Sequence, residues 1–513
     1  MFFNRCASYR GEGFRKRAGT ALVAAMSGRF IIVKNIKILD AYRGRYKILL
    51  AAIAGIVIAK LYLTNAKLCV GAILSGFCFF ILMRYPVLGV MGIMAGTTLL
   101  DYHQLLPLSK ISSVGIPDII LFTLLGAAIF RTWFMGIRAV RTPLDVPVIL
   151  FVGIGVVSLF AGALGDRYPF FAGLKDFKPM LYYLLAILAA NTIKDRKELK
   201  VVIYGCLLIG IIAVGRVIIE GWVNPPATLG DTEEIFYRYR AVAEGSMLPY
   251  WALIVFISML MLSKFRVLIM IGASVILLWL VLSFSRHLWI AFSVSVLLVV
   301  LFNLRRIPKR IVVVTVCFMI FVSLVAIAGA FGVEPIANYV KLVALRSRSL
   351  TFEGRVANWD YRVMENQYSV PVIVKHPLLG IGFAVPYRPQ IFESDDNLQA
   401  YLHNGYLWIL VKLGFAGLIP FCWLSFVFVR RGIAFGKYVD DAFLGAIVVG
   451  SVCSFLGIAV GNIAAAHFME NWEVSMFGLS MGINEVIYRL EGVETIRFNR
   501  PTMESKTLHR ERI

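Results

Sequence analysis

The chain has 513 residues, 59% of them hydrophobic and only 16% charged, and its mean hydropathy is +0.79. Soluble globular domains are about half apolar and about a quarter charged, so this composition excludes a soluble globular protein. The formal net charge of +22 does not indicate a nucleic-acid partner, because the basic residues gather in short loops between long apolar blocks.

The first 45 residues are basic and include Arg10, Arg15 and Arg17. Their single apolar run, ALVAAM, is too short for the core of a signal peptide. We therefore expect residues 1–45 to form a cytoplasmic tail.

From residue 46 onward, the apolar blocks are long enough to cross a hydrocarbon core of about 30 Å as helices. The sequence predicts an all-α, polytopic integral membrane protein with about 12–14 transmembrane helices. The predicted spans are residues 46–63, 68–83, 86–100, 116–134, 146–165, 176–192, 199–220, 246–263, 267–284, 288–304, 311–333, 404–429, 442–461 and 472–489.

The basic loops fix an expected orientation for these spans. Loops rich in Lys and Arg stay in the cytoplasm. With the N-terminal tail inside and one crossing per span, four basic loops and the C-terminal tail all fall on the cytoplasmic side. The basic residues of the four loops are Arg131, Arg138, Arg141, Lys194, Arg196, Lys197, Lys200, Arg305, Arg306, Lys309, Arg310, Arg430, Arg431 and Lys437.

The same threading leaves the unusual polar segments on the outer face. They are residues 221–245, 283–289, 334–403 and 461–473. Loops longer than about 15 residues are uncommon and usually functional, so we expect the site in or near residues 334–403. The section EGRVANWDYRVMENQYSVPVIVKHP (353–377) is predicted to form one or two short amphipathic helices at the membrane surface.

Arginines on the outer face oppose the charge bias of the other loops. Their planar guanidinium groups suit the oxygens of a diphosphate. Arg286 and Arg355 are the favoured candidates, followed by Arg240. The alternatives are a guanidinium that snorkels at a span end, for Arg286, and ordinary ion pairs within the nearly charge-balanced long loop. Lys178, at the entrance of another span, meets either a lipid phosphate or a helix-anchoring partner.

Four histidines compete for the role of a base. A neutral imidazole takes a proton from a hydroxyl at neutral pH. His403 ranks first, because Asn404 follows it and the long arginine-bearing loop ends there. His376 ranks second, and His287 and His467 follow. A bland interfacial histidine is the alternative for each.

The sequence indicates no metal or cofactor. No external Asp-x-Asp pair offers the oxygen ligands of a divalent cation, and ESDDN (393–397) is the nearest pattern. No glycine-rich phosphate loop occurs either. Arginines would then have to stabilise a phosphate leaving group.

Four motifs together resemble the bacterial O-antigen ligase and polysaccharide polymerase superfamily. They are LSFSRHLWIAF (282–292), GRVANWDYRVM (354–364), KHPLLGIGF (375–383) and LHNGYLWILVKLGFAGLIPF (402–421). The resemblance covers roughly residues 235–430.

The resemblance implies a GT-C-like, metal-independent glycosyltransferase in the bacterial inner membrane, with its site on the periplasmic face. The donor would be a glycan on undecaprenyl diphosphate, and the acceptor lipid A–core or another glycan. His403 would deprotonate the acceptor hydroxyl with inversion at the anomeric carbon. Arg286, Arg355 and Arg240 would hold the diphosphate, with Asn404 and His376 also near the substrate.

The chain then divides into five parts. These are a tail (1–45), N-terminal helices (46–234), the ligase-like region (235–430), C-terminal helices (431–489) and a second cytoplasmic tail (490–513). Ligase and polymerase are not separated by these residues. The rival functions are a flippase for the same lipid-linked saccharide and a non-enzymatic assembly subunit.

Overall fold

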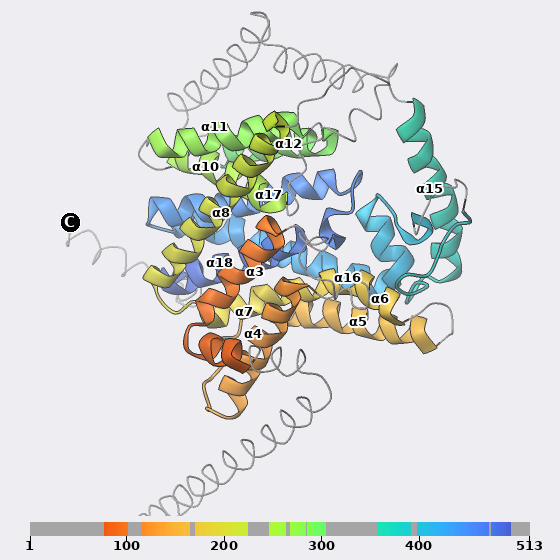
Figure 1. The fold of residues 1–513 in the computed structure, drawn as a ribbon, viewed down its shortest axis with the longest axis horizontal. Coiled ribbons are helices and arrows are strands. Elements are labelled where there is room, and N and C mark those ends of the chain that lie inside the picture. The colour runs from red at the N-terminus through yellow and green to blue at the C-terminus, as the bar shows by residue number, and fades with distance from the viewer. Residues whose placement is uncertain are drawn as a thin grey trace, which may run out of the picture. The chain divides into compact units, whose positions relative to one another are not determined.

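The computed structural model in Figure 1 describes most of the chain between residues 76 and 493. The described ranges are residues 76–100, 115–164, 170–223, 246–262, 267–283, 285–303, 356–390, 398–470 and 473–493. The chain divides into two units, residues 1–80 and 81–513. Of the first unit, residues 76–80 are described and are helical. All other described residues belong to the second unit.

The regular elements of the described ranges are all helices, labelled in Figure 1. The α-helices of the second unit are α3 (Pro86–Leu99), α4 (Ile116–Trp133), α5 (Asp145–Leu164), α6 (Phe170–Leu181), α7 (Leu185–Thr192), α8 (Arg196–Val223), α10 (Met247–Leu262), α11 (Val267–Leu282), α12 (Arg286–Phe302), α15 (Val356–Lys375), α16 (Gly405–Phe435), α17 (Ala442–Gly461) and α18 (Glu473–Leu490).

These helices confirm the prediction of an all-α, polytopic membrane protein. Five described helices are long and apolar enough to cross a membrane, or six if the pair Gly76–Arg84 and Pro86–Leu99 forms one span. Helices α10, α11 and α12 are apolar but slightly shorter. The total of about 12–14 spans stays a prediction, because spans 46–63 and 311–333 lie outside the described residues.

Helix α5 divides its apolar residues between a protein face and an outer face. On α5, Val148 and Phe151 are fully buried, whereas Ile149 and Phe160 expose about half of their side-chain surface. In water such an outer face would be costly, but lipid tails solvate it as well as a protein core does.

Helix α17 lies at the centre of the packing around the site. It packs along α10 and α12, while α16 packs along α5 and α18 along α7 (Figure 1). A Cβ atom on Gly457 of α17 would lie 2.4 Å from the carbonyl oxygen of Ala291 on α12. The glycine therefore permits a close approach of two backbones, as small residues do between membrane helices.

Helix α16 is broken at Gly414, whose φ is 62° and ψ is −163°. Four backbone hydrogen bonds of 2.8–3.2 Å join the segment 377–382 to residues 411–416 on both sides of this break. Irregular backbone at membrane depth is tolerated where protein satisfies its polar groups. The motif HPLLGIG (376–382) thus completes the hydrogen bonding of a broken membrane helix.

Candidate active site

His403 lies two residues before the first helical residue of α16. The side chain of Asn404 caps the helix, because its Oδ1 accepts hydrogen bonds from the backbone N–H groups of Tyr406 (3.0 Å) and Leu407 (3.2 Å). An N-cap asparagine satisfies donors that the first turn leaves without helical partners. The cap fixes the chain that carries His403.

A buried carboxylate holds His403 from another helix. Glu365 of α15 lies with Oε1 2.9 Å from His403 Nδ1 and with Oε2 3.2 Å from the His403 backbone nitrogen. The Glu365 side chain is 2% exposed and that of His403 is 34% exposed. A carboxylate only accepts hydrogen bonds, so Nδ1 donates and Nε2 carries the basic lone pair. This arrangement orients an imidazole that is partly exposed.

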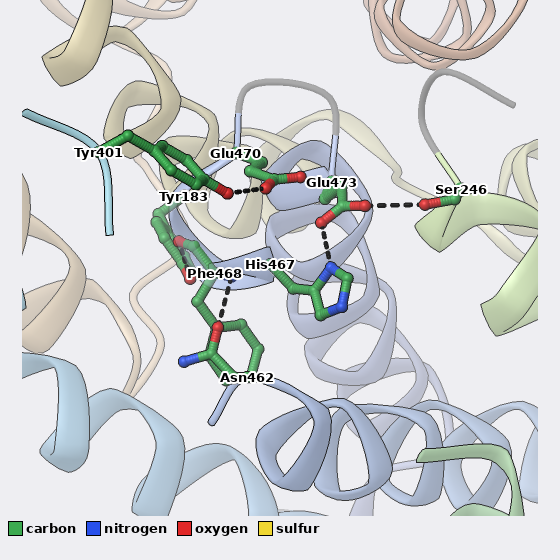
Figure 2. Close-up of polar contacts among 8 residues, drawn as sticks. All are labelled: Tyr183, Ser246, Tyr401, Asn462, His467, Phe468, Glu470 and Glu473. Carbon is green, nitrogen blue, oxygen red and sulfur yellow. Dashed lines mark hydrogen bonds and ion pairs between the residues drawn. The ribbon is translucent and has the colours of Figure 1, made fainter. Parts of the chain in front are cut away.

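Tyr401 connects this pair to a second polar group. Its ring meets the His403 ring edge-on, with 5.1 Å between centroids. Its hydroxyl donates a 2.7 Å hydrogen bond to Oε1 of Glu470 (Figure 2). Burial, followed by the charge of Glu470, holds the pKa of Tyr401 well above its ordinary value. The tyrosine therefore stays protonated and acts as a donor.

The loop between α17 and α18 supplies the second polar group. His467 Nδ1 lies 2.5 Å from Oε2 of Glu473, and Ser246 donates a 2.7 Å hydrogen bond to Oε1 of the same carboxylate (Figure 2). The loop itself is fixed by Asn462, whose Oδ1 accepts from the backbone N–H of Phe468 at 3.1 Å. His467 and Glu473 are both buried.

Atoms of His467, Glu470 and Glu473 lie within 4.8 Å of one another. Two atoms that bind one tetrahedral zinc ion are about 3.3 Å apart, given metal–ligand distances of about 2 Å. The 2.5 Å separation of His467 Nδ1 and Glu473 Oε2 is shorter than this spacing and shorter than an ordinary N–H···O hydrogen bond. The three side chains are close enough to exchange protons with one another.

Arg286 is the first residue of α12, where the chain turns back from α11. It is partly buried, as is its neighbour His287. The His287 ring lies 4.8 Å from the ring of His467. A guanidinium group at a helix N-terminus suits phosphate oxygens, because the backbone N–H groups and the helix dipole add to its charge.

The remaining predicted site residues separate into two groups. Arg240 and Arg355 lie outside the described residues. His376 follows the end of α15, and its carbonyl accepts from the N–H of Gly380 in the turn that enters the break of α16. The backbone of His376 therefore stabilises the turn that leads into the break of α16. A role of its side chain in substrate binding stays a prediction.

Sequence reasoning missed the acidic partners of the site. It treated Glu365 as part of the charge balance of the long loop and assigned no role to Glu470, Glu473 or Tyr401. Glu365 is 38 residues from His403, and Glu470 is 69 from Tyr401. No spacing rule predicts such pairs, because helix packing brings them together. The Asn404 cap, by contrast, has a local signal: an asparagine directly before an apolar helix.

Comparison with known proteins agrees with the motif resemblance. Residues 271–422 match a family described as O-antigen ligase. This range includes Arg286, Glu365, His376 and His403, and it ends within α16 before Glu470 and Glu473. No curated protein matches the chain.

Proposed function

We propose, from the O-antigen ligase domain that the chain contains at residues 271–422, that this protein transfers a glycan from undecaprenyl diphosphate to a sugar hydroxyl. The family implies lipid-linked glycan substrates. The bacterial inner membrane, a periplasmic site and cytoplasmic termini complete the proposal, and the region 235–430 is its catalytic part.

The observation that carries this proposal is the contact of His403 with Glu365. The acceptor hydroxyl gives its proton to Nε2 of His403 as its oxygen attacks the anomeric carbon. The bond from that carbon to the diphosphate oxygen breaks, and undecaprenyl diphosphate leaves. Glu365 stabilises the imidazolium formed in this step and keeps Nδ1 protonated throughout, as a buried carboxylate does beside other catalytic histidines. A single displacement inverts the anomeric carbon.

The leaving group gains negative charge and needs donors. Arg286 at the N-terminus of α12 is the proposed diphosphate contact, and Arg355, Arg240, Asn404 and His376 are proposed as further substrate contacts. Fixed positive groups stabilise the charge that develops on a phosphate without a metal ion. The required substrate is amphipathic, which accounts for a site at the ends of membrane helices.

The direct test is glycan transfer by the purified protein in nanodiscs with EDTA present. We expect wild-type transfer, and a loss of about 10²–10⁴-fold in His403→Ala, the usual contribution of a general base. Arg286→Ala should also lose transfer. Asp440→Asn, at an exposed carboxylate outside the site, is the matched control and should match wild type. Full activity of folded His403→Ala would exclude it as the base.

The break in α16 favours one alternative, a flippase for the same lipid-linked saccharide. Discontinuous membrane helices are common at transporter substrate sites. An assay in sealed vesicles distinguishes the two functions. Movement of the lipid-linked glycan across the bilayer, without transfer to any acceptor and with donor binding intact, would favour the flippase.

A further inference from the structure

The loop between α17 and α18, together with the first residue of α18, places two carboxyl groups beside one imidazole. The carboxyl oxygens of Glu470 and Glu473 and a ring nitrogen of His467 lie within 4.8 Å of one another. Figure 2 shows the two carboxyl groups side by side, with Glu470 bonded to Tyr401 and Glu473 bonded to His467 and Ser246. The loop lies outside the range that matches the O-antigen ligase family.

Each carboxyl group accepts a hydrogen bond from a neutral hydroxyl group on another segment of the chain. Tyr401, before α16, donates to Glu470, and Ser246, before α10, donates to Glu473. Among the groups of the described residues that act on Glu470, His467 is the one whose positive charge would favour the carboxylate, and it can balance one of the two carboxylate charges. Because an uncompensated charge is costly away from water, a single further proton is the simplest way to neutralise the group.

The surroundings of Glu470 favour its protonated form. Burial, and then the charge of Glu473, raises the pKa of Glu470 to about 7, although His467 acts in the opposite direction. The titratable groups around it come from several elements. They are His467 on its own loop, Glu473 at the start of α18, Tyr401 before α16, Glu365 of α15 beyond Tyr401, and His287 of α12 beyond His467.

The two carboxyl groups contact opposite parts of the proposed site. From Glu470, the contacts run through the Tyr401 hydroxyl to the ring that meets His403. From Glu473, they run through His467 to His287, next to Arg286. The loop is therefore the element that connects the proposed base to the proposed diphosphate contact.

We propose that Glu470 and Glu473 are positioning residues that share one proton. In this protonated form, the loop holds His403 and Arg286 in fixed positions relative to each other. This inference rests on the proposed function for the roles of those two residues. Loss of the shared proton places two negative charges side by side, which weakens the loop and its contacts with Tyr401 and His467.

The sign of the pH dependence follows from the direction of the pKa. Glu470 is protonated more readily in the folded protein than in the unfolded chain. Its contribution to stability is therefore complete at acidic pH and is lost as the pH rises through about 7. Glu470→Gln copies the protonated form and removes this dependence.

The test compares wild type, Glu470→Gln and the control Asp440→Asn at about pH 6 and about pH 8.5. Transfer rate and melting temperature are measured on the same samples. Relative to Glu470→Gln, wild-type transfer should fall by up to about thirtyfold between these values, the change in protonated fraction of a group with a pKa of about 7. The wild-type melting temperature should also fall more than that of Glu470→Gln, and Asp440→Asn should follow wild type.

Three results would overturn the proposal. The first is an equal pH dependence of melting in wild type and Glu470→Gln, which needs no transfer assay and so stays decisive if the proposed function fails. The second is a Glu470→Gln protein that does not fold, since the neutral isostere should be tolerated. The third is one divalent metal ion per wild-type chain that is lost in His467→Ala, which would show that a cation, not a proton, balances the carboxylates.

Discussion

The buried pair of Asp118 and Lys178 differs from the carboxyl groups near His403 in the kind of partner that each carboxyl group contacts. Between α4 and α6, Asp118 lies 2.9 Å from the ammonium group of Lys178, and also accepts from the Tyr182 hydroxyl at 2.6 Å and the Gly115 N–H at 2.6 Å. Its charge meets a full positive charge. Around His403, the carboxyl groups of Glu365, Glu470 and Glu473 contact imidazoles, hydroxyls and a backbone N–H of the described residues.

This difference separates a structural ion pair from a candidate catalytic group. The Asp118 carboxylate contacts a lysine and two further donors, so its role is to balance charge and not to accept a proton during a reaction. The bidentate pair of Arg431 and Glu485, at 2.7 and 2.8 Å, follows the same plan. Carboxylates that face histidine and tyrosine keep proton exchange available, which is what general base catalysis needs.

The largest effect on stability is expected at the ion pair of Asp118 and Lys178. Asp118→Ala leaves the Lys178 ammonium buried without its carboxylate, and breaking a buried pair in this way costs about 3–5 kcal/mol. Unfolding in denaturant at constant detergent composition measures this loss. Asp440→Asn is again the exposed control. A change below about 0.5 kcal/mol in Asp118→Ala, the range of ordinary surface substitutions, would contradict a structural role for the pair.

A smaller effect should distinguish two matched tyrosines. Tyr182 and Tyr401 each donate to a carboxylate, at 2.6 and 2.7 Å. Replacement by phenylalanine removes one hydrogen bond, worth about 1.5–3 kcal/mol where the acceptor is charged. Tyr182→Phe should lower stability and leave transfer per folded molecule unchanged. Tyr401→Phe should lower transfer as well, because it disconnects Glu470 from the segment of His403. Equal effects of both variants on transfer would remove the distinction.

Much of the fold was predictable because membrane helices have a local signal. The predicted spans 116–134 and 442–461 correspond to α4 and α17, which are long and apolar enough to cross a membrane. The segment 472–489 corresponds within two residues to helix α18, but α18 does not belong to that set of apolar helices. The amphipathic section 353–377 contains the single helix α15. The break in α16 was not predicted, because Gly414 alone does not show that residues 377–382 enter there.

The site was only partly predictable for a related reason. His403 and Arg286 were identifiable from the motifs in which they occur. Their acidic partners were not, because Glu365 approaches His403, and Glu470 approaches Tyr401, only through the packing of the helices. Likewise, the sequence left open whether Lys178 meets lipid or protein, and its contact with Asp118 answers that.

The central claim is that Glu365 acts on the reaction through His403. A double-mutant cycle with His403→Ala and Glu365→Gln, read as single-turnover transfer and with folding checked by melting temperature, tests it most directly. We expect Glu365→Gln to reduce transfer by at least about tenfold in the wild-type background and to have little further effect beside His403→Ala, because residues that act as a unit are not additive. Fully additive losses, or unchanged transfer in folded Glu365→Gln, would contradict the account.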